Sequence, residues 1–306
     1  MKSSTWLPVL EQLATGELIS GSQLGANLSV SRAAIWQRAE YLKSIGVEIE
    51  ASDIGYQLTH PVYLPDPSII QDLLMIKVDL VPEVCSTNTL ILESRTERCL
   101  ISLYQNQGRG RRGKRWIAAP GNALIFSTGV WIDCGIQDLA GLSIDVGVAI
   151  CQVLNGLGIN ARLKWPNDLW VDELKLAGLL IELQGDQDQT FVVMGIGLNL
   201  WPTVGVNAPT TSIIEASNRI WSDQDTVNLI NALCSAVNDY PSQIPADRIK
   251  RYNEVSLLNG RDIRVTAGMS QIAGTADGID EFGRLCILTD RGAEYVSAGD
   301  VSVRPQ

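Results

Sequence analysis

The sequence predicts an α+β protein of three domains, and three patterns support that expectation. Apolar residues first recur at helical spacing and are followed by two short strands, which is typical of a winged helix-turn-helix in residues 1–62. Strand and helix patterns then alternate through residues 68–255, which indicates a mixed α/β domain. Residues 256–306 break into short strands separated by Gly and Asp, which predicts a small β-barrel of SH3-like size.

The first domain is expected to hold three helices and a wing. Leucines at helical spacing mark the first helix, and Ser20 or Ser22 is placed to cap the second. The stretch SRAAIWQRAEYLKSIG, residues 31–46, carries apolar residues on one side and ends in glycine, as a third helix does. Two short strands around a turn at residues 52–55 complete the wing.

A winged helix-turn-helix typically binds DNA, with the second helix of the motif in the major groove. The side chains expected to face the duplex are those of Ser31, Arg32, Gln37, Arg38 and Lys43. However, residues 1–59 hold four Lys or Arg against six Asp or Glu, and Asp53 near the wing tip would face the phosphates. Because phosphate contacts supply most non-specific affinity, we expect DNA binding to require a dimer. The alternative is a three-helix interaction module that binds no DNA.

The residue totals narrow the possible chemistry. The chain is acidic, with a net charge of −10, and His60 is its single histidine, which argues against a histidine-rich metal site or a Ser–His or Cys–His catalytic pair. Six scattered cysteines without a C-x-x-C spacing indicate reduced thiols, so we expect a cytoplasmic protein. No segment approaches the ~18 consecutive apolar residues of a membrane span, and we expect no membrane partner.

The central domain is expected to follow an extended linker. Residues 60–67, HPVYLPDP, hold three prolines in eight positions and predict a stiff connection. Strand patterns beyond it cover residues 99–107, 122–132, 161–171, 176–186 and 190–200. Amphipathic helical patterns cover residues 137–158 and 225–240.

The stretch QGRGRRGKRW, residues 107–116, places five basic side chains among three glycines and is called the Gly/Arg loop below. A Walker A motif is excluded because Arg115 stands where that motif needs Ser or Thr, and the G-x-G-x-x-G spacing precedes an expected strand rather than a helix. A nucleic-acid contact and a solvated surface run are alternatives. Mobile backbone carrying guanidinium groups is best suited to closing over a small anion and excluding water from it.

Three other clusters could bind a small polar ligand. In KWPNDLWVDELKLAG, residues 164–178, an Asn-Asp turn lies among bulky apolar residues and Lys175 opens an apolar strand, although a surface hairpin would have the same pattern. The CSTN stretch, residues 85–88, offers hydroxyls and an amide that could bind a ligand or simply cap a helix. In GIGLNL, residues 195–200, two glycines before an asparagine allow close approach of a ligand to the backbone.

These segments, in this order, resemble those of the bacterial biotin–protein ligases that also repress the biotin operon. The matching motifs are S-T-N at 86–88, Q-x-x-G-R-G-R-R-G at 105–113, K-W-P-N-D at 164–168, K-L-A-G at 175–178 and G-x-N at 197–199. The resemblance extends over nearly the whole chain, and SRAAIW in the helix-turn-helix matches the group that carries a repressor domain. It implies a central domain of the biotin/lipoate ligase type.

The resemblance also implies a two-step reaction with biotin, ATP and Mg²⁺. Biotin's carboxylate attacks the α-phosphate of ATP to give biotinyl-5′-AMP and pyrophosphate, and a lysine of a biotin carboxyl carrier protein then attacks the mixed anhydride. The adenylate-bound protein is expected to form a homodimer and to bind operator DNA. An anion that approaches a polyanion needs cations more than a histidine, which agrees with the residue totals.

Motif positions assign roles to individual residues by resemblance. Biotin would be held by Ser86, Thr87, Asn88, Gln105, Arg109, Gly110, Arg111 and Lys175. The nucleotide and adenylate would contact Arg111, Lys114, Trp116, Asn167, Asp168 and Asn199, and Asp168 would bind the metal. Arg111 and Lys175 are expected to be the catalytic charges.

The sequence departs from the family pattern at three places. Cys85 replaces a common acidic residue before S-T-N, Lys114 replaces a common arginine, and Asp53–Ile54 replaces a more basic wing. Two other functions therefore stay open: a ligand-sensing transcription factor without turnover, and a monofunctional ligase whose first domain binds no DNA.

Overall fold

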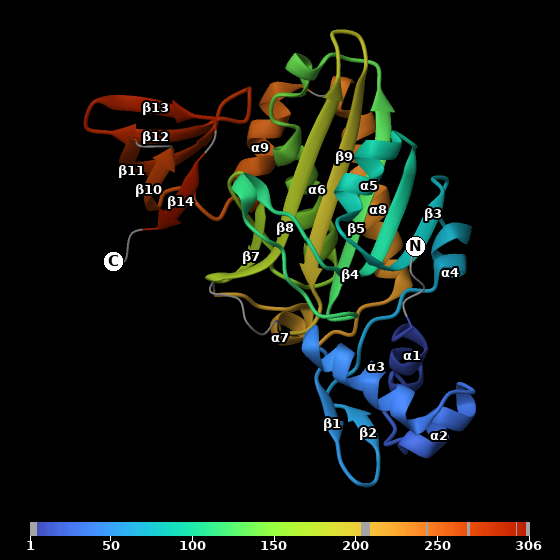
Figure 1. Cartoon of the computed structure of the whole chain (residues 1–306). Coiled ribbons are helices and arrows are strands. Elements are labelled where there is room, and N and C mark those ends of the chain that lie inside the picture. Colours follow the sequence, from blue (N-terminus) through green and yellow to red (C-terminus); the bar gives the residue numbers. More distant parts are fainter. Residues whose placement is uncertain (1–4, 203–208, 243, 268–269, 298, 304–306) are drawn as a thin grey trace.

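The fold was obtained as a computed structural model that describes residues 5–202, 209–242, 244–267, 270–297 and 299–303. The outermost ends of the expected first and third domains, residues 1–4 and 304–306, lie outside the described residues. Figure 1 shows the helix-turn-helix at one end of a large sheet and the last five strands beside it. No helix in the described ranges is long and apolar enough to cross a membrane.

The N-terminal domain has the predicted winged helix-turn-helix arrangement. Its elements are α1 (Leu7–Leu13), α2 (Gly21–Asn27), α3 (Arg32–Ser44), β1 (Ile49–Ala51) and β2 (Tyr56–Leu58). Ser20 caps α2 by accepting a hydrogen bond from the Gln23 amide, and Ser31 caps α3 by accepting one from the Ala34 amide. Buried side chains from all three helices and the wing form one core.

A seven-stranded mixed sheet forms the centre of the molecule. Its strand order is β3-β4-β5-β9-β8-β7-β6. The strands are β3 (Val78–Val84), β4 (Arg98–Gln105), β5 (Ala123–Ile132), β6 (Arg162–Lys164), β7 (Asp168–Val171), β8 (Leu174–Gly185) and β9 (Thr190–Asn199). Strands β3 and β4 pair in parallel, and the other neighbouring pairs are antiparallel. Every residue of β9 is buried, because this central strand is covered on both faces.

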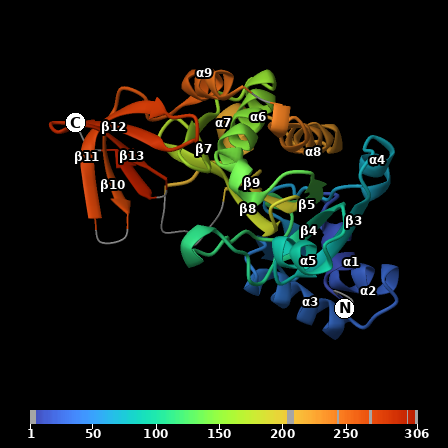
Figure 2. The ribbon, with the colours of Figure 1, turned by 90° about the horizontal axis from the view of Figure 1, so that it is seen from above.

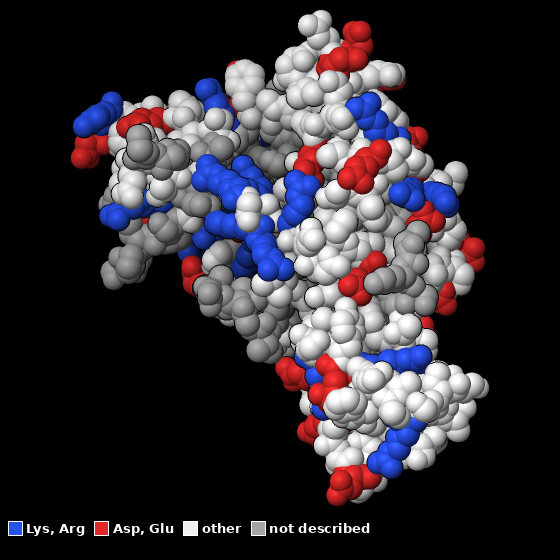
Figure 3. Space-filling view, in the orientation of Figure 1, with Lys and Arg blue, Asp and Glu red and all other residues white. Residues whose placement is uncertain are grey.

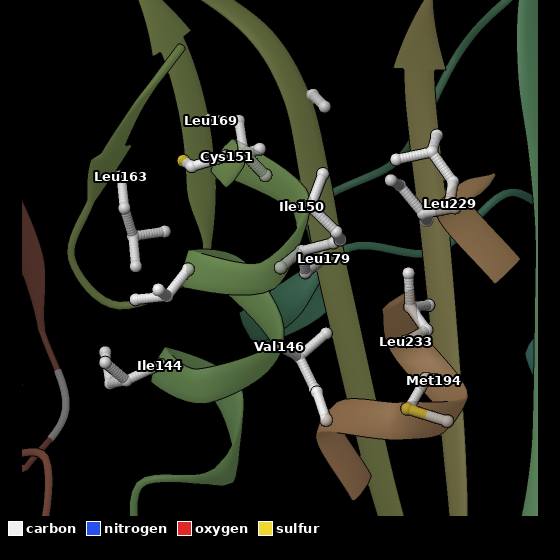
Figure 4. Close-up of a cluster of buried hydrophobic side chains, with 14 of the residues drawn as sticks. Ile144, Val146, Ile150, Cys151, Leu163, Leu169, Leu179, Met194, Leu229 and Leu233 are labelled. Carbon is white, nitrogen blue, oxygen red and sulfur yellow. The ribbon is translucent and has the colours of Figure 1, made fainter. Parts of the chain in front are cut away.

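The two faces of the sheet carry different helices (Figure 2). Helices α6 (Leu142–Gly156), α8 (Asp223–Asn238) and α9 (Pro245–Val255) lie on one face, and α5 (Thr87–Ser94) lies on the other. Figure 4 shows Val146 and Ile150 of α6 pointing toward Leu179 of the sheet, with Leu229 and Leu233 of α8 alongside. The short helix α4 (Pro67–Asp72) follows the linker, and the short helix α7 (Ile213–Ser217) comes after β9 in the chain.

The C-terminal part is a five-stranded antiparallel sheet of the SH3-like type, as predicted. Its order is β13-β12-β11-β10-β14, with β10 (Asp262–Ala267), β11 (Ser270–Ile279), β12 (Leu285–Thr289), β13 (Gly292–Val296) and β14 (Asp300–Val303). The buried side chains of these strands continue the core of the central domain. The indole of Trp165 donates to the Gly283 carbonyl oxygen at 3.0 Å, which fixes the barrel beside the β6–β7 hairpin.

The linker is tied to the central domain instead of spanning open solvent. The Tyr63 amide donates to the Gly121 carbonyl, and its hydroxyl donates to Asp223 at 2.7 Å. His60, the single histidine, lies 3.1 Å from the Asn122 side-chain oxygen and packs against the ring of Trp201. These contacts give His60 a structural partner on each side and place the first domain against the sheet.

Candidate functional site

A cavity of about 410 Å³ lies between the Gly/Arg loop, strands β5, β8 and β9 of the sheet and the C-terminal barrel. Its volume is in the range of sites for small organic ligands. The residues that the resemblance assigned to biotin and nucleotide all line it: Ser86, Thr87, Asn88, Gln105, Arg109, Gly110, Arg111, Lys114, Trp116, Asn167, Asp168, Lys175 and Asn199. The fold therefore brings together residues that are far apart in the sequence.

Buried polar groups at the start of α5 form one side of this cavity. Ser86 caps the helix by accepting from the Thr89 amide, and the Thr87 amide donates to Gln105 Oε1 at 2.7 Å. Ser127 Oγ of β5 lies 2.6 Å from Thr87 Oγ1 and 2.5 Å from Asn88 Oδ1. The CSTN segment thus caps a helix, as one interpretation of its sequence predicted, and it also lines the cavity.

Glycines in β9 let bulky side chains approach the sheet. A Cβ at Gly197 would overlap the indole of Trp116, and a Cβ at Gly195 would overlap the carboxamide of Asn88. Trp116 therefore lies flat against the strand, where it can form a wall for a planar group. The close approach expected from the GIGLNL pattern is made by the protein's own side chains.

The Gly/Arg loop folds into a small hairpin over the cavity. The Gly110 amide donates to the Lys114 carbonyl at 2.7 Å, and the Trp116 amide donates to the Gly108 carbonyl at 3.0 Å. Between them lies a short 3₁₀ turn, Arg111–Gly113, in which Arg112 and Gly113 have positive φ. Arg111 Nη1 donates to Asn167 Oδ1 at 3.2 Å, so this guanidinium joins the loop to the β6–β7 turn.

Cations converge on the cavity from several segments. Lys175 Nζ donates to Asp168 Oδ1 at 2.7 Å, and Lys164 Nζ lies 3.9 Å from the centre of the Trp170 ring. Burial lowers the pKa of Lys164, and the nearby Lys175 charge lowers it further, whereas Asp168 opposes the shift. Figure 3 shows Lys and Arg side chains gathered in one group beside the C-terminal barrel. An anionic ligand would relieve the repulsion among these charges.

Two indole nitrogens in the cavity wall are buried donors without an acceptor. Trp116 Nε1 and Trp170 Nε1 are among the buried side-chain atoms that make no hydrogen bond within the described residues. An unsatisfied buried donor costs free energy, and such groups in a native protein commonly indicate a missing partner. Together with the cations, they suit a ligand that carries several oxygen atoms.

Comparisons with known proteins agree with this geometry. The family described as "Biotin/lipoate A/B protein ligase family" matches residues 83–199, an "HTH domain" matches residues 6–57, and "Biotin protein ligase C terminal domain" matches residues 260–304. The "Bifunctional ligase/repressor BirA" of Escherichia coli (strain K12) is 32% identical over 317 residues, which cover 99% of each chain. The chain belongs to the family of bifunctional biotin ligase/repressors.

Two further comparisons cover smaller parts of the chain. The "Biotin--[acetyl-CoA-carboxylase] ligase" of Mycobacterium tuberculosis (strain ATCC 25618 / H37Rv) is 32% identical over 247 residues, which cover 74% of this chain and 88% of the relative. The structure of a biotin protein ligase from Aquifex aeolicus in complex with biotin and ATP superposes with a TM-score of 0.65 at 23% identity. It covers 75% of this chain and 99% of that chain, and it supports the fold.

Several residues of the biotin ligase cavity were missed by sequence reasoning. Lys164, Trp170 and the C-terminal residues Gly299 and Val301 line it, and Ser127 supports its polar side. Lys164 belongs to a motif that had been singled out, but its side chain was given no role. No pattern in the sequence near β14 predicts that this strand lies close to the Gly/Arg loop, because its position depends on how the barrel packs against the central domain.

Of the five side chains expected to face DNA, some are exposed and others are partly buried or make contacts within the helix-turn-helix. Arg32 and Gln37 are exposed on α3, and Arg38 is half-buried. The hydroxyl of Ser31 is occupied as the cap of α3, and Lys43 Nζ pairs with Glu40 Oε1 at 3.0 Å. Sequence reasoning gave no role to Trp36, which is 56% exposed on α3.

Among the described residues, the cavity lining offers no complete set of protein ligands for a metal ion. Asp168 is the predicted metal ligand, but one of its oxygens is taken by Lys175. No group of three or more His, Cys, Asp or Glu side chains with metal-site spacing occurs in the described ranges. Mg²⁺ often binds through substrate phosphates with one or two carboxylates, so a metal here would have to be held mainly by a nucleotide.

Proposed function

We propose that this chain joins biotin to a lysine of a biotin carboxyl carrier protein through biotinyl-5′-AMP, and that the adenylate-bound form represses transcription. One observation carries the proposal: a cavity of about 410 Å³ holds a buried hydroxyl–amide cluster on one side and Arg111, Lys114, Lys164 and Lys175 around it. The polar cluster suits the biotin ring, and the cations suit a carboxylate meeting a triphosphate.

In the first step, a carboxylate oxygen of biotin attacks the α-phosphorus of ATP. A new P–O bond forms while the bond to the β-phosphate breaks, and pyrophosphate leaves with its electron pair. Arg111 and Lys175 are proposed to hold the two anions together, because a carboxylate and a phosphate repel each other without cations between them. Lys114, Asn167, Asp168 and Asn199 are proposed to orient the nucleotide, and Mg²⁺ is proposed to arrive with it.

In the second step, the amine of a carrier lysine attacks the acyl carbon of the mixed anhydride. An amide bond forms, AMP leaves, and the amine loses a proton. The loop hairpin would first keep water away from the anhydride, because a closed site suppresses hydrolysis. Trp116 against β9 is proposed to form the wall that the adenine contacts.

Turnover separates this proposal from a sensor that only binds its ligand. Purified protein should be mixed with biotin, Mg²⁺–ATP and a carrier domain, and pyrophosphate and the mass of the carrier should be followed. We expect pyrophosphate release and a single biotinyl group on one carrier lysine. Binding of biotin without pyrophosphate release would reject the ligase. Arg111→Gly should release the adenylate early and biotinylate other lysines if the site is catalytic.

For the repressor, the supporting observation is the helix-turn-helix with Arg32 and Gln37 exposed on α3. We propose that two copies associate when the adenylate binds and that the dimer binds operator DNA in the cytoplasm. Footprinting on palindromic DNA, with biotin and ATP present and then with each omitted, tests this. Ligand-dependent protection is expected, and no protection at any site would leave a monofunctional ligase.

A further inference from the structure

The first arginine of the Gly/Arg loop is held by the protein itself. Arg109 Nη2 donates to Glu182 Oε1 of β8 at 2.7 Å, and Arg109 Nη1 donates to Thr89 Oγ1 of α5 at 3.2 Å. Both terminal nitrogens of this guanidinium are therefore engaged by two different elements beneath the loop. The charge of Arg109 is paired with a carboxylate of the protein itself.

Glu182 also supports the polar side of the cavity. Its second oxygen, Oε2, accepts a hydrogen bond from Asn88 Nδ2 at 3.0 Å. The same Asn88 nitrogen donates to the Leu180 carbonyl at 3.1 Å, which leaves Asn88 Oδ1 facing Ser127 Oγ. One carboxylate thus connects the loop to the buried hydroxyl–amide cluster.

The surroundings of Glu182 favour a fixed geometry. Its side chain is 19% exposed and projects from the middle of β8, where Glu182 pairs with Val193 of β9. A carboxylate in this position is held by the sheet, whereas Arg109 lies on a loop that the short hairpin and side-chain contacts hold over the cavity. Charge-assisted hydrogen bonds to such a fixed acceptor are stronger than those between two mobile surface groups.

We propose that Glu182 is a positioning residue that latches the Gly/Arg loop through Arg109 and orients Asn88 at the same time. Arg109 then serves to fix the loop that also carries Arg111. The inference rests on the proposed function, because the ligand that the closed loop retains is taken to be biotinyl-5′-AMP. The latch itself is formed by side chains of this chain alone.

The main test compares Glu182→Gln with the wild type and with Asp79→Asn. Asp79 is the matched control, because it forms a partly exposed ion pair with Arg98 at 3.1 Å on the same sheet. Arg98 begins β4, whereas Gln105, which lines the cavity, ends it. Trypsin cleavage within residues 109–115 of the unliganded protein reports loop opening without requiring catalysis. The release rate of preformed adenylate, followed by tryptophan fluorescence, reports retention.

Glu182→Gln should be cleaved faster in the loop and should release the adenylate roughly three- to tenfold faster, which is the range expected for one partly buried ion pair. The rate of adenylate formation at saturating biotin should change less than the KM for biotin. Asp79→Asn should match the wild type in all three measurements. Equal behaviour of Glu182→Gln and Asp79→Asn would overturn the latch.

The arginine side gives a second, independent variant. Arg109→Lys keeps a charge that can reach Glu182 and should retain the adenylate better than Arg109→Gln. In the double variant Arg109→Gln/Glu182→Gln, release should be little faster than in either single variant, because both break the same contact. If the two substitutions instead multiply their effects on the release rate, Arg109 and Glu182 do not act as a pair. The arginine variants also test the latch if Glu182→Gln alone destabilises the fold.

The two proposals can fail separately. If the wild type makes no adenylate while Glu182→Gln still accelerates loop cleavage, the ligase is wrong and the latch is right. If the wild type makes adenylate and the loop-cleavage rates are equal, the latch is wrong and the ligase stands.

Discussion

The indole of Trp6 donates a hydrogen bond to Glu83 Oε2 at 3.3 Å, and this contact joins the helix-turn-helix to the central sheet. Trp6 is the N-cap residue of α1, and Glu83 lies near the end of β3. Tyr41 of α3 donates to the same carboxylate at 3.3 Å, and Asn106 donates to its other oxygen at 3.1 Å. Leu103 of β4 belongs to the helix-turn-helix core, so the two domains share apolar packing as well.

Glu83→Ala should weaken this junction. Trp6 is 3% exposed, and its indole nitrogen would lose its acceptor at a cost of about 1–3 kcal/mol. We expect faster amide hydrogen exchange in α1 and α3, with little change in the centre of the sheet. Glu93→Ala, at an exposed site on α5, should leave exchange unchanged. Equal exchange in the two variants would mean that Glu83 does not hold the domains together.

The contact between Gly197 and Trp116 predicts a strong effect of one methyl group. Gly197→Ala would force the indole off β9 and should weaken ATP binding by roughly tenfold or more, because the overlap is with a ring that forms the cavity wall. Isothermal titration with ATP measures this. Gly156→Ala is the control, because a Cβ there meets no atom within 4 Å and should stabilise α6 by about 0.5–1 kcal/mol. Normal ATP affinity in Gly197→Ala would remove Trp116 from the nucleotide site.

A buried ion pair connects α6 to α9 and the barrel. Arg248 Nε donates to Asp145 Oδ2 at 2.6 Å, and the two side chains are 5% and 2% exposed. Arg248 Nη1 also donates to the Glu281 carbonyl at 2.7 Å. Asp145→Asn would leave the guanidinium buried without its counter-charge and should lower the unfolding free energy by about 3–5 kcal/mol.

Urea denaturation measures this loss, and an apolar double variant tests its cause. Asp145→Val/Arg248→Met removes both charges and should recover most of the stability that Asp145→Asn loses, because the desolvation cost disappears with them. If the double variant is less stable than Asp145→Asn, the loss comes from packing and from the Glu281 contact, and the charge argument fails.

The buried charge of Lys164 is expected to lower the stability of the fold while it contributes to ligand binding. Burial lowers its pKa below the usual 10.5, so the folded protein holds this proton less tightly than the unfolded chain. That difference costs stability at neutral pH, and the cost disappears as pH rises through the folded pKa toward 10.5. Lys164→Met should therefore raise the unfolding free energy at pH 7 by about 0.5–2 kcal/mol, and its advantage should shrink toward pH 10.

The same Lys164→Met variant should bind the adenylate poorly, because a cation that faces the ligand is gone. Denaturation curves at pH 7 and pH 10, with adenylate binding measured in parallel, check both effects. An advantage that grows with pH would contradict the sign of the pKa shift. Unchanged adenylate affinity would remove Lys164 from the site.

The sequence was informative where local patterns determine local structure. Ser20, one of the two predicted caps, caps α2, and the Pro-Asn-Asp turn connects β6 and β7. The strand β3, which carries Glu83, and the helix α9, which carries Arg248, were not predicted. Helix α9 is amphipathic, but five of its eleven residues are charged and few are apolar, and β3 is half-buried and contains a proline.

For the candidate site too, the sequence predicted local features but not the contacts between distant segments. Motifs identified the residues that line the cavity, because those residues belong to compact segments. The partners of these residues could not be read from the sequence: Glu182 is 73 positions from Arg109, and Asn167 is 56 positions from Arg111. Such pairs are set by strand order and register, which single-sequence patterns leave open.

The wing gives a direct test of DNA binding. Asp53 is exposed in the turn between β1 and β2, where Ser52 Oγ accepts from the Ile54 and Gly55 amides. If the wing approaches DNA, Asp53→Lys replaces a repulsive charge with a phosphate contact. Affinity for operator DNA should rise, and the slope of log K against log salt should steepen by about 0.9 for one added contact.

The matched control is Asp188→Lys, which makes the same charge change in the exposed turn between β8 and β9. Figure 1 shows that turn at the opposite end of the molecule from the β1–β2 wing. Fluorescence anisotropy at several salt concentrations, with adenylate present, compares the two. A gain confined to Asp53→Lys places the wing on DNA. Equal gains in DNA affinity for the two variants would reflect net charge alone. They would mean that the wing makes no contact with DNA, and they would leave open whether α3 does.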